Sequence, residues 1–361
     1  MRLAWGELRD FRNHLETRVE VAPGLTAAVG ENGQGKTNLL EGLYYLFALE
    51  SPRASADEPL VRRGAESAFV RGEVLTETGK LLIEVEVRPS GANRMQLNRS
   101  AVRRKRDVRQ VARAVFFGPD DIAIVQRDPD ARRRFMDEAV RALWPPREAA
   151  RTAYDKALRQ RNRLLKDWEG AGLPASLDAW DDELVRAGVA LLKDRGEAVS
   201  RLRDVAADTY AELAEGHRLE IGYEPSVEPG ADAEERFRAR LAERRGDELL
   251  RRTTLVGPHR DDLGLAVRDL KARAFASHGE AWAGALCLRL AVARAVAHEI
   301  GETPVMFLDD PFSGLDPGRR RRLAAGLAGR GQTLIAVPDR AHVPEGAEVW
   351  TVEEGRVLAA A

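Results

Sequence analysis

Residues 30–37 of this 361-residue chain read Gly30-Glu31-Asn32-Gly33-Gln34-Gly35-Lys36-Thr37, the complete pattern of a phosphate-binding loop. In that pattern the glycines let backbone N–H groups turn inward around a phosphate, the lysine reaches the outer phosphates, and the threonine hydroxyl coordinates Mg²⁺. The apolar run 25–29 reads as a buried strand entering the loop, and 38–47 reads as a helix whose N-terminus faces the phosphates. A chance glycine-rich turn would explain neither flank. The sequence therefore predicts an α/β fold that binds a nucleoside triphosphate.

A second motif contains Asp309, 273 positions downstream of Lys36. The apolar run 305–308 ends in Asp309 and Asp310, which places two carboxylates at the carboxyl end of a buried strand, where parallel sheets bind ligands. We expect Asp309 to hold Mg²⁺ through its water shell and Asp310 to polarise the attacking water. The alternative is an Asp-Asp-Pro turn that only ends the strand. The long gap between the two motifs indicates that a sizeable region is inserted into the nucleotide fold.

Two shorter motifs occupy the positions that ABC-type ATPases give to their signature and D-loop. Ser277-His278-Gly279-Glu280 stands immediately before an apolar helix, and Ser313-Gly314-Leu315-Asp316 follows the two carboxylates. Ser-x-x-Glu before an apolar helix is also an ordinary capping box. The two interpretations are compatible, because a capped helix can present its positive N-terminus and a serine to the γ-phosphate of an opposing subunit.

The order of expected elements places the nucleotide fold at both ends of the chain. Strands are expected at 2–8 and 17–21, an antiparallel pair at 70–74 and 81–87, a strand-like stretch at 269–275, and buried strands at 304–310 and 333–337. From 118 to about 250 the sequence reads as almost all helix, with helices over 147–169 and from about 177 to 215. These two would reach roughly 35 and 60 Å as an antiparallel hairpin. We predict a head built from 1–115 together with 253–361, and a helical arm domain over 116–252.

Composition narrows the class of protein. The chain is 44% hydrophobic, its formal charge is −1, and no stretch approaches the roughly 20 apolar residues of a membrane span. The single cysteine, Cys287, cannot form an intrachain disulfide, and the six histidines lack metal-ligand spacing. We therefore expect a cytoplasmic protein with no membrane partner. Fifty of its 57 basic residues are arginine, and arginine forks suit phosphate oxygens, although most of these clusters can equally be solvated helix faces.

Nearly the full length of the chain resembles the RecF family of bacterial recombinational-repair proteins, members of the ABC/SMC-like ATPases. The resemblance is carried by the phosphate loop and by five further segments: Leu8-Arg9-Asp10-Phe11-Arg12-Asn13-His14, Gly118-Pro119-Asp120-Asp121-Ile122, Arg132-Arg133-Arg134-Phe135-Met136-Asp137, Leu177-Asp178-Ala179-Trp180-Asp181 and Gly257-Pro258-His259-Arg260-Asp261-Asp262-Leu263. It implies an ABC-type ATPase head, a P-loop NTPase fold, with an inserted helical arm that contains the antiparallel hairpin.

The resemblance also implies ATP and Mg²⁺ as cofactors and a homodimer that forms on ATP. Lys36, Asp309, Asp310 and Ser277 would be the catalytic residues, with Thr37 and Asp309 at the metal. The nucleotide-binding set would be Arg12, Asn13, Gly30, Glu31, Asn32, Gly33, Gln34, Gly35, Lys36, Thr37, Asn38, Ser277 and Gly279. Each site would combine Lys36, Thr37 and Asp309 of one subunit with Ser277 of the other.

The function implied is to clamp duplex DNA at gaps or stalled forks and, with RecR and through RecO, to promote loading of the RecA recombinase. Slow ATP hydrolysis would then release the clamp. Binding of this kind uses phosphate contacts and falls steeply with salt. We expect the clusters Arg103–Arg106 and Arg159/Arg161/Arg163 to contribute to the DNA surface.

Some positions depart from the family pattern. The family usually has Ser-x-Gly-Gln where this chain has Glu280 as the last residue; glutamate still closes a capping box, so we expect the helix to form, and a direct contact of the amide is not carried over. Pro338-Asp339 stands where many ABC ATPases have a switch histidine, so sensing of the γ-phosphate by histidine is not assumed. Gln126 is the candidate for the glutamine of the Q-loop.

Other classes of protein fit the sequence less well. An SMC/Rad50-like head acting with a nuclease would need long heptad tracts, and a nucleotide-binding subunit of a transporter would carry the Leu-Ser-Gly-Gly-Gln signature. An overcoming-lysogenisation-type ATPase-nuclease would need a nuclease domain after about Val357. An ATP-gated DNA clamp that uses hydrolysis only as a timer remains open beside a robust ATPase.

Overall fold

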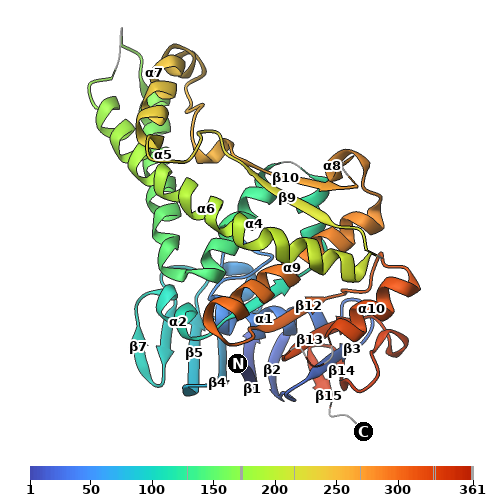
Figure 1. The fold of residues 1–361 in the computed structure, drawn as a ribbon. Coiled ribbons are helices and arrows are strands. Elements are labelled where there is room, and N and C mark those ends of the chain that lie inside the picture. The colour runs from blue at the N-terminus through green and yellow to red at the C-terminus, as the bar shows by residue number, and fades with distance from the viewer. Residues whose placement is uncertain are drawn as a thin grey trace. The chain divides into compact units, whose positions relative to one another are not determined.

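The computed structural model describes residues 1–127, 129–170, 174–214, 216–268, 270–327, 329 and 331–358 (Figure 1). Its chain forms two compact units. We call the first the head unit (Met1–Ile122, Thr209–His217 and Ser277–Ala361) and the second the arm unit (Ala123–Asp208 and Arg218–Ala276). The domain boundaries predicted from the sequence, 1–115 with 253–361 and 116–252, stay a proposal, because a compact unit need not be a domain that folds alone.

One sheet of the head unit is antiparallel, with strand order β2-β1-β4-β5-β6-β7. The expected pairing of the first two strands is present, with Leu8 opposite Thr17, and so is the expected hairpin, with Thr76 opposite Gly79 at its turn. The terminal hairpin β6–β7 was not predicted, because its strands are too short to show a clear alternation. The strands are β1 (Arg2–Phe11), β2 (His14–Glu20), β4 (Ala68–Thr76), β5 (Gly79–Val87), β6 (Arg94–Leu97) and β7 (Ser100–Val102).

The second sheet of the head unit has the order β15-β14-β3-β13-β12-β8 and is parallel except for the pair β14–β15. Its central strands β12 and β13 are buried at every position, as expected for a sheet covered on both faces. The strands are β3 (Leu25–Val29), β8 (Ala114–Phe117), β12 (Val305–Asp309), β13 (Thr333–Val337), β14 (Glu348–Glu353) and β15 (Arg356–Leu358). The carboxyl ends of β3, β13 and β12 therefore share one edge.

Helix α1 (Lys36–Ala48) packs against strands of both sheets, and its side chains join a single buried core with theirs. Tyr44 and Phe47 contact the ring of Phe307 on β12 at centroid distances of 5.9 Å. The head unit also contains η1 (Glu58–Leu60), α2 (Lys105–Val111), η2 (Pro119–Asp121), α9 (His278–Ile300), α10 (Pro317–Leu327) and η5 (Arg340–His342). The start of α1 is thus held by a large apolar core rather than by a flexible loop.

The arm unit is built mainly from α4 (Pro129–Leu143), α5 (Glu148–Asp167), α6 (Leu177–Leu213) and α7 (Ala233–Arg251), of which the last residues of α6, from Thr209, belong to the head unit. Arg147, just before α5, bonds Glu197, whereas Arg161 near its end bonds Asp181. Later residues of α5 therefore contact earlier residues of α6, so the predicted antiparallel hairpin is confirmed (Figure 1). Residues 171–173 and 215, at the expected ends of these helices, lie outside the described residues.

Two expectations for the arm region are wrong. The stretch read as almost all helix contains strand β9 (Leu219–Glu224), which pairs with β10 (Asp262–Val267) in a sheet of order β11-β10-β9. The strand-like stretch 269–275 contains only the two-residue strand β11 (Leu270–Lys271), followed by the helical turn α8 (Ala272–Phe275), while residue 269 lies outside the described part. The small elements α3 (Ile122–Gln126), η3 (Pro145–Arg147) and η4 (Pro258–Arg260) complete the described elements.

The motif at 257–263 has a structural explanation within the arm unit. Asp261 is fully buried and accepts hydrogen bonds from Arg195, Tyr223 and the backbone N–H of Ser226. Its neighbour Asp262 receives both arms of the Arg132 guanidinium, at 2.5 and 2.9 Å. These carboxylates tie helices to the small sheet, which is the kind of buried pairing that an ionised group needs.

His259 of the same motif is held as a neutral ring. Its Nε2 lies 3.0 Å from the carbonyl of Thr254 and its Nδ1 lies 2.6 Å from the Tyr154 hydroxyl. The carbonyl can only accept, so Nε2 carries the proton and the tyrosine donates to Nδ1. Burial lowers the pKa of His259 to about 4, which agrees with the neutral form.

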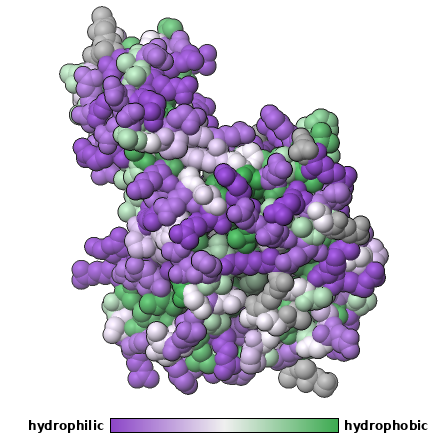
Figure 2. Space-filling view, in the orientation of Figure 1, coloured by the Kyte–Doolittle hydropathy of each residue, from purple (hydrophilic) through white to green (hydrophobic). Residues whose placement is uncertain are grey.

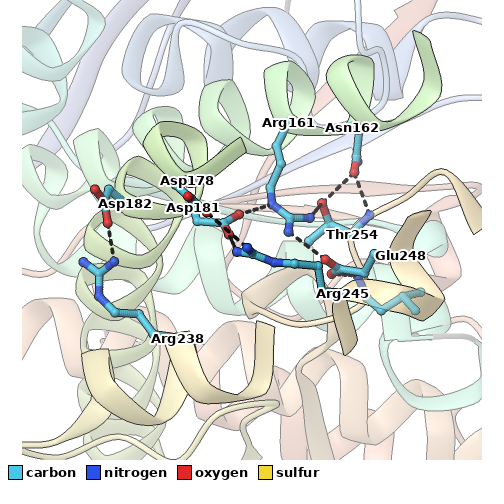
Figure 3. Close-up of polar contacts among 10 residues, drawn as sticks. Arg161, Asn162, Asp178, Asp181, Asp182, Arg238, Arg245, Glu248 and Thr254 are labelled. Carbon is cyan, nitrogen blue, oxygen red and sulfur yellow. Dashed lines mark hydrogen bonds and ion pairs between the residues drawn. The ribbon is translucent and has the colours of Figure 1, made fainter. Parts of the chain in front are cut away.

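A buried arginine joins three helical segments of the arm unit (Figure 3). Arg161 has no exposed surface; its guanidinium donates to Asp181 at 2.6 Å, to Glu248 at 2.6 Å and to the Thr254 hydroxyl at 2.9 Å. Asp181 is shared with Arg245. The expectation that Arg161 belongs to a DNA surface is therefore wrong. Arg159 and Arg163, one helical turn apart on the opposite face of α5, are exposed.

Hydrophilic residues cover most of the face shown in Figure 2. Among the described residues, no helix combines the length and the hydropathy that crossing a membrane requires.

We predict that Arg161→Met lowers the free energy of unfolding by about 3–5 kcal/mol, because it leaves the buried Glu248 carboxylate without its cation and Asp181 with Arg245 alone. Arg163→Met is the matched control, since its side chain is 79% exposed and should change stability by less than about 0.5 kcal/mol. Urea unfolding followed by circular dichroism measures both variants. Equal midpoints for the two would contradict the role assigned to Arg161.

Candidate nucleotide-binding site

The phosphate loop runs from the end of β3 to the start of α1, as its sequence predicts. Gly35 has φ 109°, a conformation that a side chain disfavours, and a Cβ there would lie 2.6 Å from the Asn13 amide nitrogen. The N–H of Leu39 bonds the carbonyl of Gly35, so the N–H groups of residues 36–38 are the free donors of the first helical turn. This arrangement offers an anion both donors and the positive end of a helix.

Lys36 lies over the loop that precedes it. Its Nζ donates to the carbonyl of Gly30 at 2.6 Å and to that of Glu31 at 2.8 Å. Burial lowers the pKa of Lys36, and the nearby carboxylates of Asp309 and Asp310 oppose that shift. The ammonium group therefore sits where it can exchange carbonyl oxygens for phosphate oxygens.

Thr37 and Asp309 meet although 272 positions separate them. The threonine Oγ1 donates to Asp309 Oδ1 at 2.9 Å. Asp309 ends β12 and is 7% exposed, and burial raises the pKa of its carboxyl while the bond from Thr37 lowers it. The two motifs that the sequence placed far apart thus form one cluster of oxygen atoms.

Asp310 follows directly and has an unusual backbone. Its φ is 50°, in the left-handed region that a non-glycine residue seldom adopts, and its N–H bonds the carbonyl of Ala336 on β13. Backbone strain of this kind tends to occur at functional positions. Burial raises the pKa of Asp310, and the charges of His342 and Lys36 lower it.

His342 was missed by sequence reasoning. It lies in η5, where Asp339 caps the turn by accepting from the N–H of Ala341 and lies 2.9 Å from the His342 Nδ1. Arg320 lies 3.0 Å from the other ring nitrogen. The position after β13 expected for a switch histidine is indeed Pro338, but the short turn beyond it brings His342 within electrostatic reach of Asp310. The Asp-x-x-His spacing of 339–342 was the available signal.

A polar cavity of about 350 Å³ lies between the phosphate loop and the end of β12. Of the residues predicted to act in catalysis or to bind nucleotide or metal, those that line the cavity are Asn32, Gly33, Gly35, Lys36, Thr37, Asn38, Asp309 and Asp310. Arg53, which sequence reasoning did not select, lines it too, and its charge acts on Asp309. Gly30, Glu31 and Gln34 lie in the loop but not on this surface.

Asn13 and Arg12 approach the loop in different ways. The Asn13 side chain accepts from Asn38 Nδ2 at 2.8 Å and donates to the carbonyl of Gln34 at 3.3 Å. Arg12 instead forms a bidentate pair with the fully buried Glu41, at 2.9 and 2.8 Å. Glu41 also binds Arg53. Arg12 therefore supports the position of Arg53 from within the head unit.

The predicted capping box at Ser277 is confirmed. The serine Oγ accepts from the N–H of Glu280, and the Glu280 carboxylate accepts from the N–H of Ser277 at 2.9 Å. The Ser277 hydroxyl also lies 2.9 Å from the same carboxylate oxygen, to which it donates. Among the described residues that line the cavity, neither Ser277 nor Gly279 is found.

The helix that starts at this serine is fixed to the rest of the head unit. Trp282 Nε1 donates to the carbonyl of Pro311, next to Asp310, and its ring packs edge-on against Phe117. Arg289 binds Asp121 through two nitrogens, at 3.1 and 2.6 Å, and Pro119 of the same short helix lines the cavity. Gln126, the candidate for the Q-loop, is exposed and belongs to the arm unit.

The donor set suits a cation that arrives with its ligand. Among the described residues, no cluster of three or more His, Cys, Asp or Glu side chains forms a metal site of its own. Thr37 and Asp309 supply hydroxyl and carboxylate oxygens, which are the hard ligands that Mg²⁺ takes while keeping waters and phosphate oxygens in its shell. The residues present therefore fit Mg²⁺ bound together with a nucleotide.

Comparisons with known proteins agree with this geometry. The model of the RecF/RecN/SMC N terminal domain matches residues 4–354. The DNA replication and repair protein RecF of Streptomyces avermitilis is 43% identical over 97% of both chains, and that of Frankia alni is 42% identical over the whole of both.

Solved structures give the same result. Two structures of the recombination mediator protein RecF in the RecFOR pathway, one with ATP and one with ATPrS, match with TM-scores of 0.90 and 0.91 at 28% identity. They cover 99% and 100% of this chain and 97% and 98% of theirs. The SMC head domain of Pyrococcus furiosus, at 16% identity and a TM-score of 0.58, shares the fold. The predicted fold class, an ABC-type ATPase head with an inserted helical arm, is confirmed, and the chain belongs to the RecF family.

Proposed function

We propose that this chain is an ATP-dependent DNA-binding protein of recombinational repair. It dimerises on ATP, clamps duplex DNA at gaps or stalled forks, and is released by slow, DNA-stimulated ATP hydrolysis. The observation that carries the proposal is the hydrogen bond between Thr37 and Asp309, because it joins both nucleotide motifs in one polar cavity. The family supports the biological setting, since its curated relatives are named for DNA replication and repair.

Within the cavity each side chain has a proposed task. The N–H groups at the start of α1 and the Lys36 ammonium bind the phosphates of ATP. Thr37 and Asp309 hold Mg²⁺, which supplies charge neutralisation to the phosphates when bound. Asp310 orients the attacking water, and the strained backbone at this residue fixes its carboxylate. Arg53 offers a further cation at the rim.

The proposed dimer follows from the position of Ser277. It begins a helix of 23 residues, yet it does not line the cavity that contains Lys36. A second copy would bring its own Ser277 and helix N-terminus to the phosphates, so that ATP joins the two protomers. The bond from the Ser277 hydroxyl to Glu280 must then be exchanged for a bond to phosphate.

The head unit carries a basic surface that suits DNA phosphates. Arg103 and Arg104 are exposed between β7 and α2, and neither has an ion-pair partner within the described chain. Arg99, also exposed, lies in the β6–β7 turn with φ 65°. Unpaired arginines need not break an existing bond to contact a phosphate, so we assign this patch to DNA. In the arm unit, Arg159 and Arg163 of the cluster Arg159/Arg161/Arg163 are exposed, and Arg163 forms an ion pair with Asp167.

Partners are inferred from the relatives. The solved structures are of a recombination mediator protein in the RecFOR pathway, which supports RecO and RecR as partners. Loading of RecA is the outcome that we propose. A cytoplasmic location follows from that role. The alternative is an SMC/Rad50-like head acting with a nuclease, which the fold alone allows.

We predict that Asp309→Asn removes most of the gain in ATP affinity that Mg²⁺ provides, because the amide cannot hold the hydrated cation. With Mg²⁺ present, the ATP affinity should fall about 10- to 100-fold. In EDTA it should not change. Asp208→Asn, an exposed carboxylate on α6, is the control. Isothermal titration calorimetry with and without Mg²⁺ measures this, and an equal loss in EDTA would contradict the assignment.

We predict that Ser277→Arg leaves ATP binding intact but prevents ATP-dependent dimerisation, because the long cation fills the space of the phosphate contact. Glu280→Gln should strengthen the dimer about tenfold, since it removes a negative charge near the partner's phosphates and leaves the serine hydroxyl bonded to a neutral, weaker acceptor. Ser90→Arg, at an exposed loop, controls for added charge. Light scattering with and without ATP measures dimerisation. A normal dimer of Ser277→Arg with ATP would rule out contact of Ser277 with the ATP of the other protomer.

We predict that Arg103→Glu with Arg104→Glu weakens ATP-dependent DNA binding and lowers the slope of log affinity against log salt by about two. Arg63→Glu with Lys80→Glu makes the same change in charge elsewhere on the head unit and should have little effect. Fluorescence anisotropy with gapped duplex at several salt concentrations measures both. An unchanged slope would show that the patch is only a solvated face.

A further inference from the structure

Two segments from opposite ends of the chain form hydrogen bonds with backbone carbonyls of the phosphate loop. The first is the β1–β2 turn, where His14 is fully buried and its Nε2 lies 3.0 Å from the carbonyl oxygen of Gly35. The second is the β14–β15 turn, where the N–H of Gly355 donates to the carbonyl of Gln34 at 2.8 Å. The hydroxyl of Thr17 links them, because it lies 3.0 Å from both His14 Nδ1 and the carbonyl of Gly355.

The chemistry of His14 fixes the direction of its bond to the loop. A carbonyl oxygen can only accept, so Nε2 must carry a proton. Burial lowers the pKa of His14, which favours the neutral ring with its single proton on Nε2. Nδ1 then lies 3.0 Å from the Thr17 hydroxyl, whose single proton is donated either to Nδ1 or to the carbonyl of Gly355.

The β14–β15 turn makes a second, independent attachment. Besides the bond from Gly355, the N–H of Glu354 donates to the side-chain Oε1 of Gln34 at 2.7 Å. Glu354 and Gly355 have φ 47° and 74°, the positive values of a two-residue hairpin turn. A Cβ on Gly355 would lie 2.3 Å from the backbone oxygen of Asn13, so only glycine lets the turn come this close.

These bonds set the orientation of two consecutive peptide groups. In a planar trans peptide the C=O and the following N–H point in opposite directions. The carbonyls of Gln34 and Gly35 are drawn toward Gly355 and His14, and Leu39 N–H also bonds the second of them. The N–H groups of Gly35 and Lys36 are consequently turned the other way, and both residues line the cavity of the phosphate site.

We propose that His14 and the Glu354–Gly355 turn are positioning elements that preset the N–H groups of Gly35 and Lys36 for phosphate binding. They contact the loop through its carbonyl oxygens, on the side away from the cavity, and do not contact the nucleotide. The proposal rests on the proposed function only in taking the polyphosphate of ATP as the ligand. Because the donors are aligned before the ligand arrives, binding avoids the cost of ordering the loop.

His14 is tested with a pair of variants in the full chain. His14→Phe keeps a ring but loses the donor, whereas in His14→Gln the side-chain amide can reach the same carbonyl. We expect His14→Phe to weaken ATP, ADP and inorganic tripolyphosphate by a similar factor of about ten, and His14→Gln to restore most of the loss. Turnover at saturating ATP should be unchanged, so that the effect lies in KM rather than kcat.

The hairpin is tested with a matched pair of glycines. Gly355→Ala and Gly346→Ala impose a side chain at similar φ, 74° and 77°, but a Cβ on Gly346 meets nothing within 4 Å. We expect only Gly355→Ala to weaken tripolyphosphate binding. In ¹⁵N spectra of the ligand-free protein, the amide signals of Gly35 and Lys36 should move in Gly355→Ala and His14→Phe but stay in place in Gly346→Ala.

The outcomes separate this proposal from the proposed function. Unchanged tripolyphosphate affinity in both His14→Phe and Gly355→Ala overturns it, as does a lower melting temperature with unchanged affinity, since that is a purely structural role. A loss in His14→Phe that His14→Gln does not restore also overturns the role of the donor. If the wild-type chain itself fails to bind ATP, the proposed function fails, and this proposal with it.

Discussion

The parallel order of β3, β13 and β12 is the constraint on which the site depends. Because the carboxyl ends of parallel strands meet at one edge, the start of α1 and the end of β12 come together whatever length of chain separates them. The bond from Thr37 to Asp309 is the local result. Parallel strands need crossover connections rather than tight turns, so an insertion within a crossover leaves the register of the sheet intact. This is how a helical arm can occupy the middle of the sequence without disturbing the nucleotide site.

Charge in this chain is used for folding as well as for binding. An ionised group removed from water must be compensated by close partners, and Arg161, Asp261 and Glu41 each lie at 0% exposure with at least two polar partners. Such pairs add geometric definition where the arm unit has a smaller apolar core. Arginine suits the task because its planar fork binds two carboxylates at once. A high arginine content with a net charge near zero is therefore consistent with many internal ion pairs and a few exposed patches.

The sequence was informative where a motif or a long periodic run carried the signal. The phosphate loop, the carboxylates at 309–310, the capping box and the α5–α6 hairpin were all predicted, since each depends on local residue types. Strand β9 was missed because its pairing with β10 is a contact between distant segments. Arg161 was misassigned because residues that are close in sequence need not share a face of a helix. Arg159 and Arg163 share one face of α5, and Arg161 points the opposite way. His342 was missed because a short turn, rather than the strand itself, carries it toward Asp310.

The charges around the cavity also constrain what can bind there. Asp309 is a buried carboxyl and Asp310 a half-buried one, both with raised pKa values, and Lys36 is a buried amine with a lowered pKa, so burial disfavours every charge in the group. The two carboxylates are matched only by the cations of Lys36 and Arg53, so the cavity has no surplus positive charge for a polyphosphate, which the two carboxylates repel. Repulsion of this kind is strong in a partly desolvated cavity. Mg²⁺ held by Thr37 and Asp309 would offset this repulsion with its positive charge and would favour the ionised form of both carboxyls. Under the proposed function, each of the nucleotide and the cation therefore increases the affinity of the site for the other.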